Sequence, residues 1–63
     1  MTNFSASEKL KEVEREIAQR RRVYPRLIGA GKMSRAAADR QIAILEAIRD
    51  DYRSKADEER LPL

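Results

Sequence analysis

The sequence predicts an all-α protein, an antiparallel two-helix hairpin that pairs with a second copy as a homodimeric four-helix bundle. Two runs of apolar residues recur at helical spacing, and a short glycine-containing segment separates them. A serine suited to cap a helix stands before each run. We expect one domain over 1–63, with a first helix over about 6–28, a turn over 29–33, a second helix over about 35–57 and a frayed tail over 58–63.

The first helix has a clear predicted start. Ser5 and Glu8 have the spacing of a capping box, and Phe4 stands just before it, where an apolar side chain can contact the first turns. Arg20 and Arg21 interrupt the apolar stripe for one turn, where their methylene stems can lie along its edge. The stripe itself is narrow and consists of Leu10, Val13, Ile17, Tyr24, Leu27 and Ile28.

Pro25 leaves two alternatives for the end of this helix. Proline removes a hydrogen bond and biases the preceding residue away from helical angles, so the helix either ends near Val23 or bends and continues. The period of the apolar stripe continues past the proline, which favours the bend. Gly29 or Gly31 then supplies the left-handed residue that ends the helix.

The second helix begins after Ser34, a predicted N-cap, and carries a broader apolar arc with Gln41 inside it. The arc consists of Ala38, Ile42, Ile44, Leu45, Ile48 and Tyr52. Complementary charges at helical spacing predict exposed ion pairs within helices. These pairs are Glu46 with Arg49, Asp50 with Arg53, Asp51 with Lys55, and Glu16 with Arg20 on the first helix.

Two helices cover only one side of each other, so the broad arc needs another surface. A second copy is the simplest source of that surface, and a partner protein from a host is the alternative. The predicted dimer core consists of Leu10, Val13, Ile17, Ile42, Leu45, Ile48 and Tyr52.

The composition excludes several classes of function. The chain contains no cysteine and no histidine, which removes zinc fingers, disulfide frameworks and histidine-dependent catalysis. We therefore expect no enzyme, cofactor or metal. No apolar run approaches the roughly 20 residues of a membrane span, and no signal peptide opens the chain, so a cytoplasmic location away from the membrane is expected.

Charge is unevenly distributed along the chain. The segment 20–40 holds seven basic residues against Asp39 alone, although the net charge is only +3. In a hairpin these residues gather at the turn end, where they fit phosphates or an acidic protein surface; the alternative is an ordinary helix end, where the dipole favours arginines. They are Arg20, Arg21, Arg22, Arg26, Lys32, Arg35 and Arg40. Tyr24 beside two arginines has the composition of an interface hot spot, or else is a core residue with a wet hydroxyl.

The segment from Glu14 to Tyr52 resembles a group of small phage and prophage helical-hairpin proteins. The likeness covers about 39 of 63 positions, and Arg-Arg-Arg-Val-Tyr-Pro is its most distinctive part. Proteins of this size and shape include phage anti-activators of quorum sensing, which are dimeric hairpins that bind a LuxR-type transcription activator of the host and block its DNA binding. Some of them also restrain a pilus assembly ATPase. The resemblance implies a phage protein acting in a bacterial host cell.

Three functions are therefore weighed. The first is a non-enzymatic inhibitor of a host regulatory protein, anchored by Arg20, Arg21, Tyr24 and Arg26; if its target is a basic DNA-binding domain, the contact instead comes from Glu12, Glu16, Asp50 and Asp51. The second is a nucleic-acid-binding accessory protein with its basic turn end on phosphates. The third is a structural phage component, which forms assemblies larger than a dimer.

Overall fold

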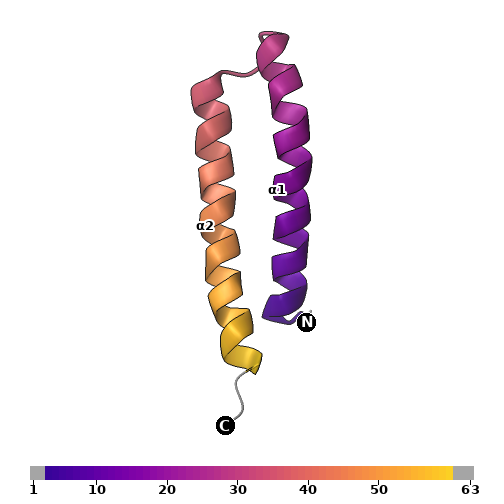
Figure 1. Cartoon of the computed structure of the whole chain (residues 1–63), viewed down its shortest axis with the longest axis vertical. Helices are drawn as coiled ribbons and strands as arrows, with labels where there is room; N and C mark the ends of the chain where they lie inside the picture. The colour runs from indigo at the N-terminus through magenta and orange to yellow at the C-terminus, as the bar shows by residue number, and fades with distance from the viewer. Residues whose placement is uncertain (1–2, 61–63) are drawn as a thin grey trace.

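The computed structural model describes residues 3–60, which form two antiparallel helices joined by a short turn (Figure 1). Helix α1 spans Ala6–Gly29 and helix α2 spans Arg35–Arg60. The helices lie side by side along a molecule that measures 51 × 20 × 19 Å. Neither helix has a segment long and apolar enough to cross a membrane. The predicted hairpin is confirmed.

The start of α1 is the predicted capping box. The Ser5 side chain accepts a hydrogen bond from the Glu8 backbone N–H (3.1 Å), and the Glu8 carboxylate accepts one from the Ser5 backbone N–H (3.1 Å). The bond from the Ser5 backbone N–H, and then a bond from the Ser5 hydroxyl to the same carboxylate (3.1 Å), lower the pKa of Glu8 because both favour the charged carboxylate. Phe4, next to the cap, stays largely exposed, so its predicted contact with the first turns leaves most of the ring in solvent.

Pro25 lies inside α1, which continues to Gly29. An end near Val23 is therefore wrong. Proline cannot donate to the carbonyl of Arg21, but Pro25 and Arg21 are both exposed, so water can hydrate that carbonyl. The helix thus passes through the proline without leaving a buried polar group unsatisfied.

Gly31 ends α1 through its left-handed backbone, with φ of 73°. Its N–H donates to the Ile28 carbonyl (3.0 Å), and the N–H of Lys32 donates to the Leu27 carbonyl (2.9 Å). This pair of bonds is a Schellman motif, which satisfies carbonyls that a helix end leaves open. Of the two glycines in the turn, Gly31 is the one whose backbone conformation requires glycine.

Helix α2 begins at the predicted cap, where the Ser34 side chain accepts from the Ala37 backbone N–H (3.1 Å). It ends at Arg60, three residues beyond the expected end at 57, so residues 58–60 are helix and not part of a frayed tail. The Glu59 carboxylate accepts from the Ala6 backbone N–H (3.3 Å), which ties this last turn to the start of α1. The rest of the predicted tail, 61–63, lies outside the described residues.

The helices pack along two stripes whose residues alternate at steps of three and four, the spacing of a coiled coil. We call these two stripes the seam. Five of residues 3–60 are buried, and all of them belong to the seam: Ala6, Ile17, Tyr24, Ala38 and Ala56. On α1 the seam consists of Ala6, Leu10, Val13, Ile17, Arg20, Tyr24 and Leu27, and on α2 of Ala38, Ile42, Leu45, Arg49, Tyr52, Ala56 and Glu59.

The apolar arc predicted for α2 only partly enters this seam. Ile44 and Ile48 lie outside it, with 48% and 37% of their surface exposed. Arg49, which we expected on the exposed face, lies in the seam, and 24% of its side chain is exposed. A single antiparallel helix contacts only a narrow stripe, so it cannot cover an arc as wide as the one on α2.

The two glycines of the turn provide a matched test of the Schellman motif. Open space surrounds the position of an added Cβ at both, so only backbone geometry separates them. We expect Gly31→Ala to lower the free energy of unfolding by about 1–2 kcal/mol, because an L-residue is strained at positive φ. Gly29→Ala should leave it unchanged or raise it by up to about 1 kcal/mol. Thermal or urea unfolding at one fixed protein concentration measures both; equal effects would contradict the assignment.

The capping box makes a second prediction, on pH. Ser5→Ala should cost about 1 kcal/mol at neutral pH, whereas Ser54→Ala, at an exposed site inside α2, should cost nothing. A carboxyl whose pKa is lowered by folding stabilises the fold above its unfolded pKa of about 4.3, and this contribution disappears as the pH falls through the lower folded value. The difference between wild type and Ser5→Ala should therefore shrink below pH 4 in urea titrations. A difference that stays constant to pH 2 would show that Glu8 takes no part.

Candidate protein-binding surfaces

The hairpin has two edges, one on each side of the seam, and the first is closed by ion pairs. Arg21 on α1 forms an ion pair with Glu46 on α2, and Arg53 Nη2 lies 3.4 Å from Glu14 Oε2. Each of these pairs connects the two helices. We call this side, which includes Glu14, Arg21, Glu46 and Arg53, the ion-pair edge.

These contacts replace most of the ion pairs predicted within helices. Arg20 Nε does donate to Glu16 Oε1 (2.6 Å), as predicted. The other three predicted pairs are wrong for the described residues: Glu46 and Arg53 have partners across the hairpin, Arg49 Nε donates to Asp50 (3.1 Å), and Asp51 forms no ion pair with Lys55. The seam brings α1 side chains within reach, which helical spacing on α2 alone does not reveal.

On the opposite edge a buried tyrosine joins the helices. The Tyr24 hydroxyl donates to Gln41 Oε1 (2.7 Å) and accepts from Arg20 Nη1 (3.0 Å), and 8% of the residue is exposed. The bond to Glu16, and then the bond to Tyr24, raise the pKa of Arg20, which stays charged. We call this second side the tyrosine edge. Tyr24 is thus a core residue, as the second of the two interpretations above predicts, but its hydroxyl is bonded to Gln41 and Arg20 where a solvated hydroxyl was expected.

Two of the other predicted anchors are also occupied within the chain. Arg20 is held by Glu16 and Tyr24, and Arg21 by Glu46. Arg26 is exposed and forms no ion pair with any residue from 3 to 60. Of the four predicted basic and aromatic anchors, only Arg26 presents a charge without an ion-pair partner in the described part of the chain.

The turn end nevertheless carries a concentrated positive charge. Five exposed basic residues there have no ion pair within the described range: Arg22, Arg26, Lys32, Arg35 and Arg40. We call them the basic end. The charge of the sequence segment 20–40 predicted this surface, but it did not reveal that Arg20 and Arg21 form contacts within the hairpin.

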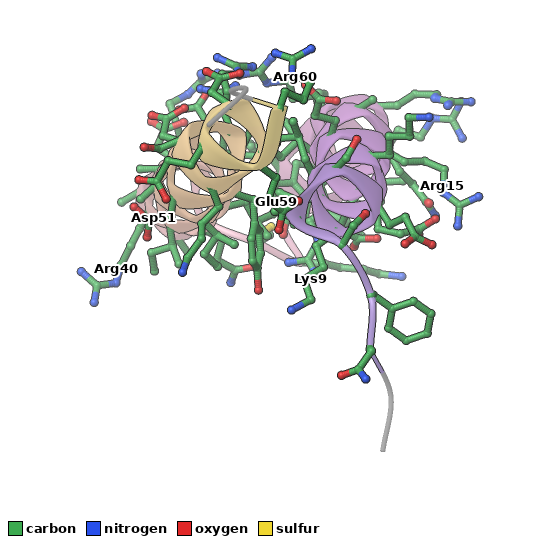
Figure 2. All side chains as sticks on the ribbon, turned by 90° about the horizontal axis from the view of Figure 1, so that it is seen from below. Lys9, Arg15, Arg40, Asp51, Glu59 and Arg60 are labelled. Carbon is green, nitrogen blue, oxygen red and sulfur yellow. The ribbon has the colours of Figure 1, made fainter. Side chains whose placement is uncertain are left out.

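Most of the predicted acidic anchors, in contrast to the basic end, have ion-pair partners within the hairpin. Glu12 pairs with Arg15 (2.9 Å), Glu16 with Arg20, and Asp50 with Arg49. Of these four anchors, Asp51 alone has no ion pair with any residue from 3 to 60. It points outward from α2, on the side away from α1 (Figure 2).

Apolar side chains are also left in solvent. Val23 is 39% exposed, and Ile44 and Ile48 lie one helical turn apart on α2. Of the predicted dimer core, six members lie in the seam of a single hairpin, namely Leu10, Val13, Ile17, Ile42, Leu45 and Tyr52. Ile48 is the exception. The role of these residues in a dimer stays a prediction.

No protein-family model, curated protein or solved structure matches this chain. Within residues 3–60 no three acidic side chains gather as a metal-binding group would.

The hydroxyl of Tyr24 gives a test of the tyrosine edge. Tyr24→Phe should lower the free energy of unfolding by about 1–2 kcal/mol, because it removes the donor to Gln41 and the acceptor for Arg20. Tyr52→Phe is the matched control, since the Tyr52 hydroxyl has no hydrogen bond within the described residues and its ring instead faces Lys9 Nζ at 5.7 Å. Urea unfolding should separate the two variants. Equal losses would show that the Tyr24 hydrogen bonds contribute nothing specific.

Proposed function

We propose that this chain is a non-enzymatic binding protein that pairs as a homodimeric four-helix bundle and inhibits a regulatory protein of a bacterial host. The observation that carries the proposal is the basic end, where five exposed cations lack ion pairs among residues 3–60. Exposed charges attract a surface of opposite sign and speed its association. The proposed target therefore presents an acidic surface.

The ion pairs of the acidic residues also favour an acidic target surface. Three of the four candidates already hold arginine partners within the hairpin, so a basic DNA-binding domain would have to displace those partners. An acidic surface meets the basic end without that cost. If the target is a LuxR-type activator, as the resemblance to phage anti-activators implies, we expect contact with an acidic region outside its DNA-binding surface. A pilus assembly ATPase is a second target of the same kind.

The test uses two charge-reversal variants that change the net charge equally. Arg22→Glu/Arg26→Glu alters the basic end, and Lys11→Glu/Arg15→Glu alters an equally spaced pair near the other end of α1. A purified LuxR-type activator bound to its promoter DNA is titrated with each protein in a mobility-shift assay. Wild type and the Lys11/Arg15 variant should release the activator from DNA, and the Arg22/Arg26 variant should fail to do so.

If neither wild type nor the control binds that activator, the same three proteins are used to capture partners from host lysate. A regulatory protein retained by wild type and the control, but not by the Arg22/Arg26 variant, supports the proposal with another target. Equal retention by all three proteins, or by none of them, contradicts the proposal.

The basic end also suits the alternative function, binding of nucleic acid through phosphates. That interaction weakens steeply with salt, in a log-linear manner, because bound phosphates release counterions. Titration of the wild type with duplex and single-stranded DNA and RNA at about 50 mM salt distinguishes the two functions. If the wild type binds DNA or RNA and the Arg22/Arg26 variant does not, nucleic-acid binding is favoured. If the wild type binds neither, this alternative is removed.

A further inference from the structure

Helix α2 carries an apolar stripe that α1 does not cover. Ile44, Ala47 and Ile48 are all exposed, and Arg40 and Asp51 stand at the two ends of the stripe. Both charged side chains project from the outer side of α2, away from α1 (Figure 2). Neither forms an ion pair with any residue from 3 to 60. The stripe thus has an apolar centre and an unpaired charge of opposite sign at each end.

This arrangement is complementary to itself. When α2 is laid antiparallel against another α2 about a two-fold axis midway between Ile44 and Ile48, each isoleucine faces the other isoleucine of the second copy. Arg40 then lies opposite Asp51 of the second copy, within about one residue's rise of 1.5 Å. A two-fold interface repeats every contact, so both charges of both copies find a partner.

We propose that this stripe is the homodimer interface, with the two α2 helices antiparallel and two Arg40–Asp51 ion pairs between copies. The inference rests on the proposal that the chain forms a dimer, and it adds the face, the direction and the register. A second copy is the occupant because one stripe supplies both the charge and its complement, Arg40 six residues and Asp51 five residues from the same centre. An unrelated partner would need a matching basic and acidic residue of its own.

The position of the stripe leaves the seam intact. Successive residues turn by about 100°, which places Ile44 and Ile48 on average about 100° from the centre of the seam, and Arg40 and Asp51 about 150° from it. The second α2 therefore docks on the outer side of α2 and does not displace α1. The two-fold axis brings the α1 helices of both copies to the same side of the α2 pair. The two turns then lie at opposite ends of the bundle.

Charge reversal tests the register directly. In Arg40→Asp two aspartates meet at each end of the interface, and in Asp51→Arg two arginines meet. We expect either variant to raise the dimer dissociation constant by about tenfold or more, because two attractive pairs become repulsive. Asp39→Arg is the matched control, since Asp39 lies toward the ion-pair edge of α2, away from the stripe. Sedimentation equilibrium measures the constants, and circular dichroism verifies that the helices persist.

Two recovery experiments separate pairing from a general effect of charge. The double variant R40D/D51R should return the dissociation constant to within about threefold of wild type. A mixture of the two single variants should form heterodimers in preference to either homodimer, because every contact is then between opposite charges. A further variant, Ile48→Asp, should give a helical monomer.

The outcomes are distinct for each proposal. A wild type that stays monomeric at all concentrations overturns both the dimer and this interface. A wild-type dimer whose dissociation constant is unchanged in both single variants retains the dimer and overturns this interface. Single variants that weaken the dimer without recovery in R40D/D51R or in the mixture overturn the Arg40–Asp51 pairing and the antiparallel register.

Discussion

The narrow contact between two helices is the constraint on which the rest of this structure depends. Each helix can turn only a stripe toward the other, and no described side chain is fully buried as a result. Three of the five buried residues are alanines, which let the backbones approach but bury little apolar surface. Conformational entropy opposes folding at every ordered residue. Packing alone is therefore a weak source of stability here, and the hairpin also depends on its ends and on polar contacts between the helices.

Those polar contacts determine register more than stability. An apolar seam of similar residues tolerates a shift by one heptad, but the bond from Tyr24 to Gln41 and the two ion pairs across the hairpin match only one alignment. The bond from Ala6 to Glu59 holds the same alignment at the open end, where the Glu59 carboxylate lies between the helices (Figure 2). Exposed ion pairs are worth little individually. Spread over the length of the seam, they favour one antiparallel arrangement against its neighbours.

The sequence predicted local features well because neighbouring residues decide them. The capping box at Ser5, the cap at Ser34 and the glycine end of α1 depend on a few residues each. The seam of α2 could not be predicted in the same way, because it depends on which positions of α2 face α1. Arg49 faces α1, whereas Ile44 and Ile48 lie outside the seam. Hydropathy ranks isoleucine as the better interior residue, but the register of the antiparallel partner decides which positions face it. For the same reason the partners of Arg21 and Arg53 were missed.

This division of surfaces bears on how the molecule could act. Tyr24 is buried and bonded to Gln41 on α2, so it cannot contact a target without disturbing the seam, and Arg20 is held within α1 by Glu16 and Tyr24. The surfaces that remain share only Arg40: one is an apolar stripe along α2 with a charge of each sign at its ends, and the other is the basic end, whose other four cations stay outside the stripe. A surface that carries both signs of charge can pair with the same surface on a second copy of the chain. A surface of one sign repels the same surface on a second copy and attracts a different molecule. In an antiparallel dimer the two basic ends lie far apart, so each remains available and one dimer presents two equivalent binding surfaces.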